Sequence, residues 1–217
     1  MNKKMKSSLF EFASRFFYDV ISPRFRGSSF KNFMDYAYIL FEKVAINFEF
    51  LLNGYINMYE EMVEKELHNI SINSEDSVLV IGCGSIPATT FLISKISNAK
   101  RIVSIDLDLR AVKNSLNLIK KTNLYNNIEF EKADGLNYPI KDFDFIFVLY
   151  GIKKQKKLLG YISKNMKQDS CVVFRTTNDF FNKYVGGEEF LSNLFNIEEH
   201  IVAESFDETI SFVLKKK

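Results

Sequence analysis

A glycine turn directly after an apolar run is the part of the sequence most able to do chemistry. Residues Val78 to Ile81 are apolar, and Gly82-Cys83-Gly84 follows them. Glycine allows a tight turn and lets a ligand approach the backbone without meeting a Cβ atom. Asp106 ends the next apolar run, 24 residues after Gly82, where its carboxylate could accept both hydroxyls of a ribose. A strand, a glycine turn, a helix and a second strand with a terminal acid together predict a nucleoside-binding site.

The residue that opens the following helix indicates which nucleoside cofactor would fit. Enzymes that bind a dinucleotide seat its pyrophosphate on backbone N–H groups at this helix start. Pro87 stands there, and proline has no N–H group to offer. S-adenosylmethionine has no phosphate, so we predict it as the cofactor. The predicted contacts on the turn and the second strand are Gly82, Cys83, Gly84, Ser85, Pro87, Asp106 and Leu107.

Two segments further along the chain supply additional candidate contacts. Asp134 and Gly135 follow the third expected strand, where Asp134 could accept the exocyclic amine of adenine. An Asp-Gly pair that only forms a turn explains these two residues equally well. Tyr150 closely follows the fourth expected strand and is a further predicted contact. That strand lacks an Asn/Asp-Pro-Pro-Tyr ending, which is the motif that grips a planar amine.

The hydrophobic pattern divides the chain into two parts. Residues 1–72 follow a helical period, with a loop at 22–29 and a possible break at Gly54. The last of these helices, at about 55–67, carries an acidic face of Glu60, Glu61, Glu64 and Glu66. We predict an N-terminal helical subdomain over 1–72, on the lid or acceptor side, followed by a cofactor-binding domain over 73–217.

From residue 73 onward, short apolar strands alternate with amphipathic helices, which is typical of βαβ units in a mostly parallel sheet. Expected strands lie at about 77–81, 101–105, 127–131, 143–148, 170–175, 197–203 and 208–214. Expected helices lie near 87–97, 108–121, 153–166 and 179–194. The fold class is therefore α/β, with a Rossmann-like sheet of seven strands whose last two form an antiparallel hairpin at the edge.

This order of elements resembles the class I methyltransferases, which use S-adenosylmethionine. Within that fold, the turn running into Ile86-Pro87-Ala88-Thr89 is similar to the Gly-Ser-Gly-Pro-Leu-Pro-Leu-Thr segment of nicotianamine synthases. Further similar pieces are residues 144–147, the strand ending at 173–176 and the closing 207–213. The resemblance covers roughly residues 50–217. It implies that S-adenosylmethionine could donate its aminocarboxypropyl arm and leave methylthioadenosine.

Three functions are compatible with these residues. The first is methyl transfer to a small molecule or a protein side chain; the second is aminocarboxypropyl transfer, as in nicotianamine synthases. The third is a binding module of the same fold without catalysis. The resemblance aligns Tyr55 and Tyr59 loosely with a tyrosine-bearing helix that meets the methionine end of the donor, although both could simply pack the helix. Tyr55 and Glu60 are the predicted catalytic residues, placed to orient an amine and take its proton.

Composition and charge set limits on partners. A net charge of +2 gives no global reason to bind nucleic acid, and Lys153, Lys154, Lys156 and Lys157 are interpreted as a solvated face. No run is long enough to span a bilayer, so a cytoplasmic protein without a membrane partner is expected. Two histidines and two cysteines, none of them in a metal-binding spacing, predict no metal site. The oligomeric state cannot be read from the sequence.

Overall fold

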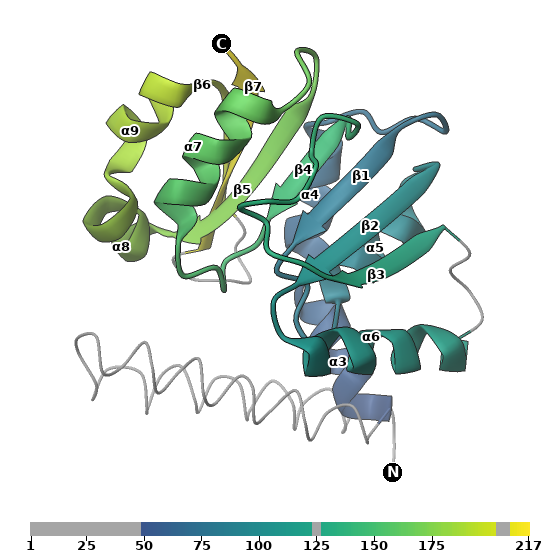
Figure 1. Ribbon diagram of the computed structural model, residues 1–217. Coiled ribbons are helices and arrows are strands. Elements are labelled where there is room, and N and C mark those ends of the chain that lie inside the picture. The colour runs from purple at the N-terminus through teal and green to yellow at the C-terminus, as the bar shows by residue number, and fades with distance from the viewer. Residues whose placement is uncertain (1–48, 123–126, 203–208) are drawn as a thin grey trace, which may run out of the picture. The chain divides into compact units, whose positions relative to one another are not determined.

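A single mixed sheet positions the glycine turn (Figure 1). The structure is a computed structural model that describes residues 49–122, 127–202 and 209–217. Its strands are β1 (Ser77–Ile81), β2 (Arg101–Asp106), β3 (Ile128–Lys132), β4 (Phe145–Val148), β5 (Cys171–Thr177), β6 (Phe195–Val202) and β7 (Thr209–Lys216). They are ordered β3-β2-β1-β4-β5-β7-β6, and all pairs are parallel except the two that β7 makes. The predicted seven-stranded α/β sheet and its edge hairpin are confirmed.

Helices cover both faces of this sheet. In the unit that contains the sheet, the helices are α4 (Glu60–His68), α5 (Ala88–Ile96), α6 (Leu109–Thr122), α7 (Gln155–Asn165), α8 (Asn178–Phe180), the π-helical segment η3 (Phe181–Val185) and α9 (Gly187–Leu194), and α3 (Glu49–Met58) precedes them in the chain. Leu79 and Ile81 of β1 share one buried cluster with Leu158 of α7 and Leu191 of α9. The helices α4 and α5 lie on the opposite side of the strands (Figure 1). Both faces of β1 are thus covered, which explains why it is apolar and buried from Val78 to Ile81.

The chain separates into two compact units, residues 1–58 and residues 59–217. The first contains α3, and the expected helices before residue 49 lie outside the described residues. The second contains α4 together with the whole sheet. The subdomain predicted over 1–72, with its lid role, stays a prediction.

The helix predicted at 55–67 is wrong in its boundaries. The structure has two helices there, and they meet at Tyr59, whereas Gly54 lies inside α3. A glycine inside a helix costs only about 1 kcal/mol relative to alanine, so it permits a break without forcing one. Helix α4 packs through the side chains that it buries, namely Met62, Val63 and Glu66.

The single helix predicted at 179–194 is also wrong. The structure contains α8, η3 and α9 in its place, with an interruption at Gly186 and Gly187. Both glycines have positive φ, 99° and 68°, which is the left-handed region that ends a helix. The chain turns there, and η3 and α9 both pack on the sheet through buried side chains such as Phe181 and Leu191.

Candidate cofactor-binding site

The glycine turn lies at the carboxyl end of β1, where the strand order reverses between β2 and β4. This switch point is where open α/β sheets bind ligands. Gly82 and Gly84 both have positive φ, 85° and 70°. The Gly82 N–H donates to Ile105 O of β2 at 2.8 Å, and the Ser115 hydroxyl of α6 donates to Gly84 O at 3.0 Å. The turn is therefore held from two sides by neighbouring elements.

Asp106 is bonded directly to this turn. Its Oδ2 accepts the Gly84 N–H at 2.9 Å, and its Oδ1 accepts the Asp108 N–H at 2.9 Å. Each carboxylate oxygen has a second lone pair, so the group can accept two further hydrogen bonds. Leu107, the next residue, exposes 66% of its surface. The sequence-predicted ribose acceptor thus lies beside the sequence-predicted glycine turn.

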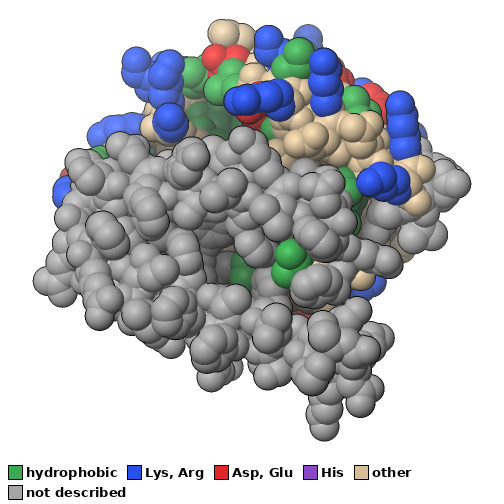
Figure 2. Space-filling model, turned by 90° about the horizontal axis from the view of Figure 1, so that it is seen from below, with side chains coloured by type: hydrophobic (Ala, Val, Ile, Leu, Met, Phe, Trp, Pro, Cys, Tyr) green, Lys and Arg blue, Asp and Glu red, His purple; other side chains and the backbone are tan. Residues whose placement is uncertain are grey.

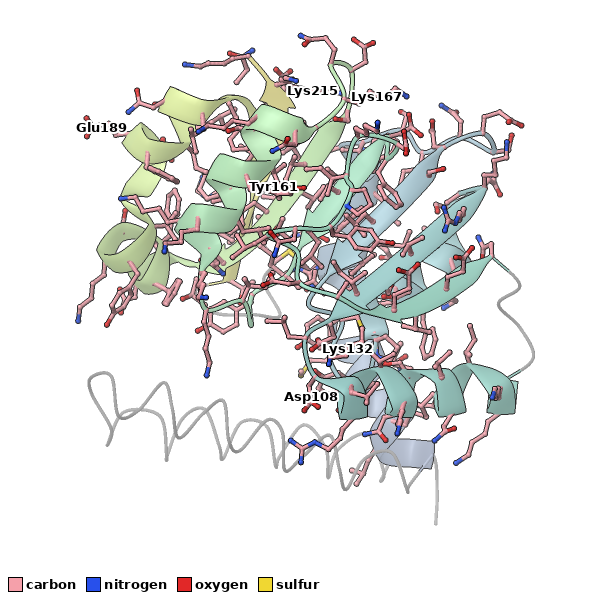
Figure 3. The ribbon with its side chains drawn as sticks, viewed as in Figure 1. Asp108, Lys132, Tyr161, Lys167, Glu189 and Lys215 are labelled. Carbon is pink, nitrogen blue, oxygen red and sulfur yellow. The ribbon has the colours of Figure 1, made fainter. Side chains whose placement is uncertain are left out.

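The third predicted segment is joined to the same place through Asp106. The Ala133 N–H donates to Asp106 O at 3.1 Å. Asp134 Oδ1 accepts the Leu136 N–H at 3.0 Å, the hydrogen bond of a local turn. Gly135 is buried, and a Cβ atom added to it would lie 2.8 Å from Ile81 Cγ2. Gly135 therefore serves the packing of β1, while the Asp134 carboxylate stays half-buried at the edge that Asp108 and Lys132 mark in Figure 3.

The segment after β4 runs along the other side of the turn. The Leu149 N–H donates to Ile81 O at 3.1 Å. Ile152 Cγ1 would lie 3.1 Å from a Cβ atom added to Gly82, a contact that sequence reasoning missed. Tyr150 is half-buried, and its ring meets that of Phe180 edge-on, with 6.2 Å between centroids. The predicted contacts at Gly82, Gly84, Asp106 and Tyr150 thus lie on segments that the structure brings together.

These residues fit S-adenosylmethionine better than a dinucleotide. Pro87 is buried at the N-cap of α5 and offers no N–H group for a pyrophosphate. The Cys83 side chain is 5% exposed, so the turn presents backbone at that residue. Ser85, between them, is half-buried. The arrangement provides a carboxylate acceptor and a glycine-lined approach, which suit an uncharged ribose and adenine.

Comparison with protein families agrees with this geometry. The family described as "Methyltransferase domain" matches residues 72–212, more than half of the chain. The chain belongs to the methyltransferase domain family. S-adenosylmethionine is the cofactor of that family, as the glycine turn and Pro87 predicted.

Solved structures show the same fold at low identity. The chain superposes on MtNAS, a nicotianamine synthase in complex with MTA and tNA, with a TM-score of 0.69 and 15% identity, covering 82% of this chain and 69% of that one. A mutant of MtNAS in complex with S-adenosylmethionine gives a TM-score of 0.68. An RNA methyltransferase from Salinibacter ruber, in complex with S-adenosyl-L-homocysteine, gives 0.55 at 14% identity, covering 72% and 91% of the two chains.

A curated relative comes from Methanocaldococcus jannaschii and is described as an uncharacterized protein. It is 28% identical over 148 residues, which cover 67% of this chain and 53% of the relative. The chain thus spans about half the length of the curated relative that it matches.

The two predicted catalytic residues lie on different compact units of the chain. Tyr55 is on α3, in the first unit. Glu60 is on α4, where its Oε1 accepts a hydrogen bond from Nζ of Lys95 on α5 at 2.8 Å. That ion pair is partly exposed and ties two helices together. The catalytic roles of Tyr55 and Glu60 stay predictions.

The sequence did not predict a buried ion pair that contacts α5, the helix that follows the glycine turn. The sequence places Glu66 on the acidic face of its helix, but the structure buries it completely. Arg175 of β5 donates from Nε and Nη2 to the two Glu66 oxygens at 3.0 and 2.6 Å, and from Nη1 to Thr89 Oγ1 at 3.0 Å. The Ser211 hydroxyl of β7 adds a bond to Glu66 Oε1 at 2.5 Å. The only sequence signal was an arginine inside an apolar strand, a residue type that is rarely buried unless paired.

Burial shifts the pKa values of two further titratable side chains, Cys171 and Tyr138. Both cysteines are buried, and burial raises the pKa of the Cys171 thiol to about 11, so it is protonated at neutral pH. Burial, followed by a hydrogen bond to Glu131, raises the pKa of Tyr138 to about 12. Within the described residues, no cluster of three His, Cys, Asp or Glu side chains is placed to hold a metal ion.

A shallow hollow of about 410 Å³ lies at the amino ends of β1 and β2. Its lining includes the ion pairs Lys100–Glu75 and Arg101–Glu129. This is the edge where Lys167 and Lys215 lie in Figure 3, opposite the glycine turn. The hollow is therefore separate from the candidate site. In the described part of the chain, no helix has the length and apolar character needed to cross a membrane.

Proposed function

We propose that this chain transfers the methyl group of S-adenosylmethionine, and that the cofactor lies along the glycine turn with its ribose on Asp106. The bond between the Gly84 N–H and Asp106 Oδ2 is the observation that supports this most directly, because it fixes the acid beside the turn. The cofactor supplies a sulfonium that activates its neighbouring carbons toward in-line attack. The chain's own residues have to orient the donor and the acceptor, which alone can lower the activation barrier by several kcal/mol.

Asp106→Asn is expected to weaken S-adenosylmethionine binding about 10- to 150-fold. A carboxylate accepts at both oxygens, whereas an amide turns one of them into a donor, so a charge-assisted bond of about 1.5–3 kcal/mol is lost. Isothermal titration calorimetry would measure the affinity. Asparagine preserves the shape of the side chain, so the turn can keep one of its two backbone bonds.

Asp108→Asn is the matched control for this measurement. Asp108 lies two residues away at the same edge, and its carboxylate caps Arg110 N at 2.9 Å. Its substitution should change the affinity less than about threefold. Equal losses in the two variants would mean that Asp106 acts only on the local backbone and that the ribose assignment is incorrect.

Aminocarboxypropyl transfer is the second candidate, and the likeness to MtNAS favours it. That structure gives a TM-score of 0.69, against 0.55 for the RNA methyltransferase. Both likenesses are below 25% identity and concern the fold, so the two reactions are separated by chemistry. Attack on the methyl carbon leaves S-adenosylhomocysteine, and attack on the aminocarboxypropyl carbon leaves methylthioadenosine.

We expect S-adenosylhomocysteine as the nucleoside product of turnover. Liquid chromatography of a reaction with amine, carboxylate, thiol and nucleic-acid acceptors would identify it. A heat-inactivated sample sets the level of spontaneous donor breakdown. Methylthioadenosine above that level, dependent on an acceptor, would replace methyl transfer with the second candidate.

A further inference from the structure

The start of α7 carries four exposed lysines where a helix disfavours positive charge. They are Lys153, Lys154, Lys156 and Lys157, and the first turn of α7 contains no acid. The positive end of the helix dipole repels cations there, so these residues oppose local stability. Within the described residues none of the four lysines forms an ion pair. Local conflicts of this kind are expected at functional sites.

These lysines adjoin the candidate cofactor site. Lys153 directly follows Ile152, whose side chain lies against Gly82. Because β4 and β5 are parallel, α7 and the α8–η3 segment both begin at the edge that holds the glycine turn. Figure 2 views the molecule from this side and shows separate Lys and Arg side chains across the surface that the described residues form. Nearby acids on α8 and α9 are Asp179, Glu188 and Glu189.

Aromatic rings extend from the same edge to the surface. Tyr150 meets Phe180 at 6.2 Å between centroids, and Phe180 meets Tyr184 at 4.9 Å. Tyr184 exposes 49% of its surface, and Lys183 Nζ lies 5.4 Å from the centre of its ring. The row of rings therefore ends in an exposed aromatic side chain beside a cation.

We propose that the basic and aromatic side chains at the start of α7 and on η3 form a docking surface for single-stranded nucleic acid. The members of this surface are Lys153, Lys154, Lys157, Lys183 and Tyr184. Lys156 is placed differently, because its Nζ lies 4.7 Å from the Phe190 ring. We also propose that the bound strand carries the methyl acceptor, and this part rests on the methyl transfer proposed above.

The geometry distinguishes this ligand from a small anion. Lys153 and Lys154 precede the first residue of α7, Lys157 lies in its first turn and Lys183 lies on η3, so the charges are distributed over separate segments of backbone instead of one turn. An extended chain of phosphates matches that spread, and an unstacked base can lie on the Tyr184 ring. This proposal revises the sequence-based interpretation of the lysines, which lacked the aromatic partner from η3.

The test is binding of fluorescent 20-nucleotide oligomers, rU and dT, to the whole chain, followed by anisotropy at several salt concentrations. Lys153→Gln with Lys157→Gln should weaken binding about tenfold at low salt and reduce the salt slope by about 1.4, since each lost contact to a single strand removes about 0.7. Tyr184→Leu should also weaken binding about tenfold, and Tyr184→Phe should retain it. Tighter binding of rU than of dT would assign the surface to RNA, and the reverse to DNA.

The matched control is Lys164→Gln with Lys217→Gln, two exposed lysines away from the start of α7. Wild-type affinity in this pair supports the surface, and a loss equal to that of the α7 pair overturns it. Poly-glutamate or inorganic polyphosphate bound as tightly as the oligomers, with no effect of Tyr184→Leu, would also overturn it. S-adenosylmethionine binding, measured on the same protein, separates failure of this proposal from failure of the proposed function.

Discussion

Replacing Arg175 by methionine is expected to lower the free energy of unfolding by about 3–5 kcal/mol, because it leaves the Glu66 carboxylate buried without its cation. Glu66 and Arg175 expose 0% and 3% of their surfaces, so water cannot replace the lost partner. A loss of this size is a large part of the 5–15 kcal/mol that stabilises a typical domain. Urea denaturation, followed by circular dichroism, would measure it.

Two comparisons make this prediction specific. The double substitution Glu66→Leu with Arg175→Met removes both charges and should recover most of the loss, since an apolar pair of similar volume is often tolerated. Arg101 and Glu129 form a pair of the same bidentate geometry that is about half exposed on each side. Arg101→Met should cost no more than about 1 kcal/mol. Similar losses for Arg175→Met and Arg101→Met would show that burial does not set the energy of the Glu66 pair.

The sequence predicted those features of the site that depend on local pattern. The strand from Val78, the glycine turn and Asp106 follow one another along the chain, and each has a recognisable composition. The parallel sheet then brings Gly84 and Asp106 together, because both strands end at the same edge. The effect of Pro87 is also local, because it depends only on the N–H group that this residue lacks.

Features that depend on distant partners were missed. Glu66 looks like its acidic neighbours on α4, and it is buried only because Arg175 lies opposite it, 109 residues further along the chain. Nothing in the sequence distinguishes Ile152 from other apolar residues. Its contact with Gly82 arises because the segment after β4 lies beside the glycine turn. The break at Gly186 and Gly187 was visible as two adjacent glycines, but the periodicity on either side favoured one continuous helix.

Gly82→Val is expected to weaken S-adenosylmethionine binding more than about 100-fold while the sheet still folds. Gly82 has φ of 85°, which costs a β-branched residue about 1–3 kcal/mol, and the new side chain enters the space above the turn. Calorimetry would report binding, and far-UV circular dichroism with thermal unfolding would report the fold. Gly160→Ala is the control, because an added Cβ meets nothing within 4 Å there, and stability should be kept or rise by about 0.4–1 kcal/mol.

The contact with Ile152 allows the two roles of Gly82 to be separated. A Cβ atom on residue 82 would lie 3.1 Å from Ile152 Cγ1, so part of any damage can come from packing. Ile152→Ala opens that space, and Gly82→Ala with Ile152→Ala should therefore regain stability relative to Gly82→Ala alone. If the glycine is needed for the cofactor, affinity stays low in the double variant although stability returns. Recovery of both together would show that Gly82 is required only for the turn and its packing, and would remove it from the cofactor site.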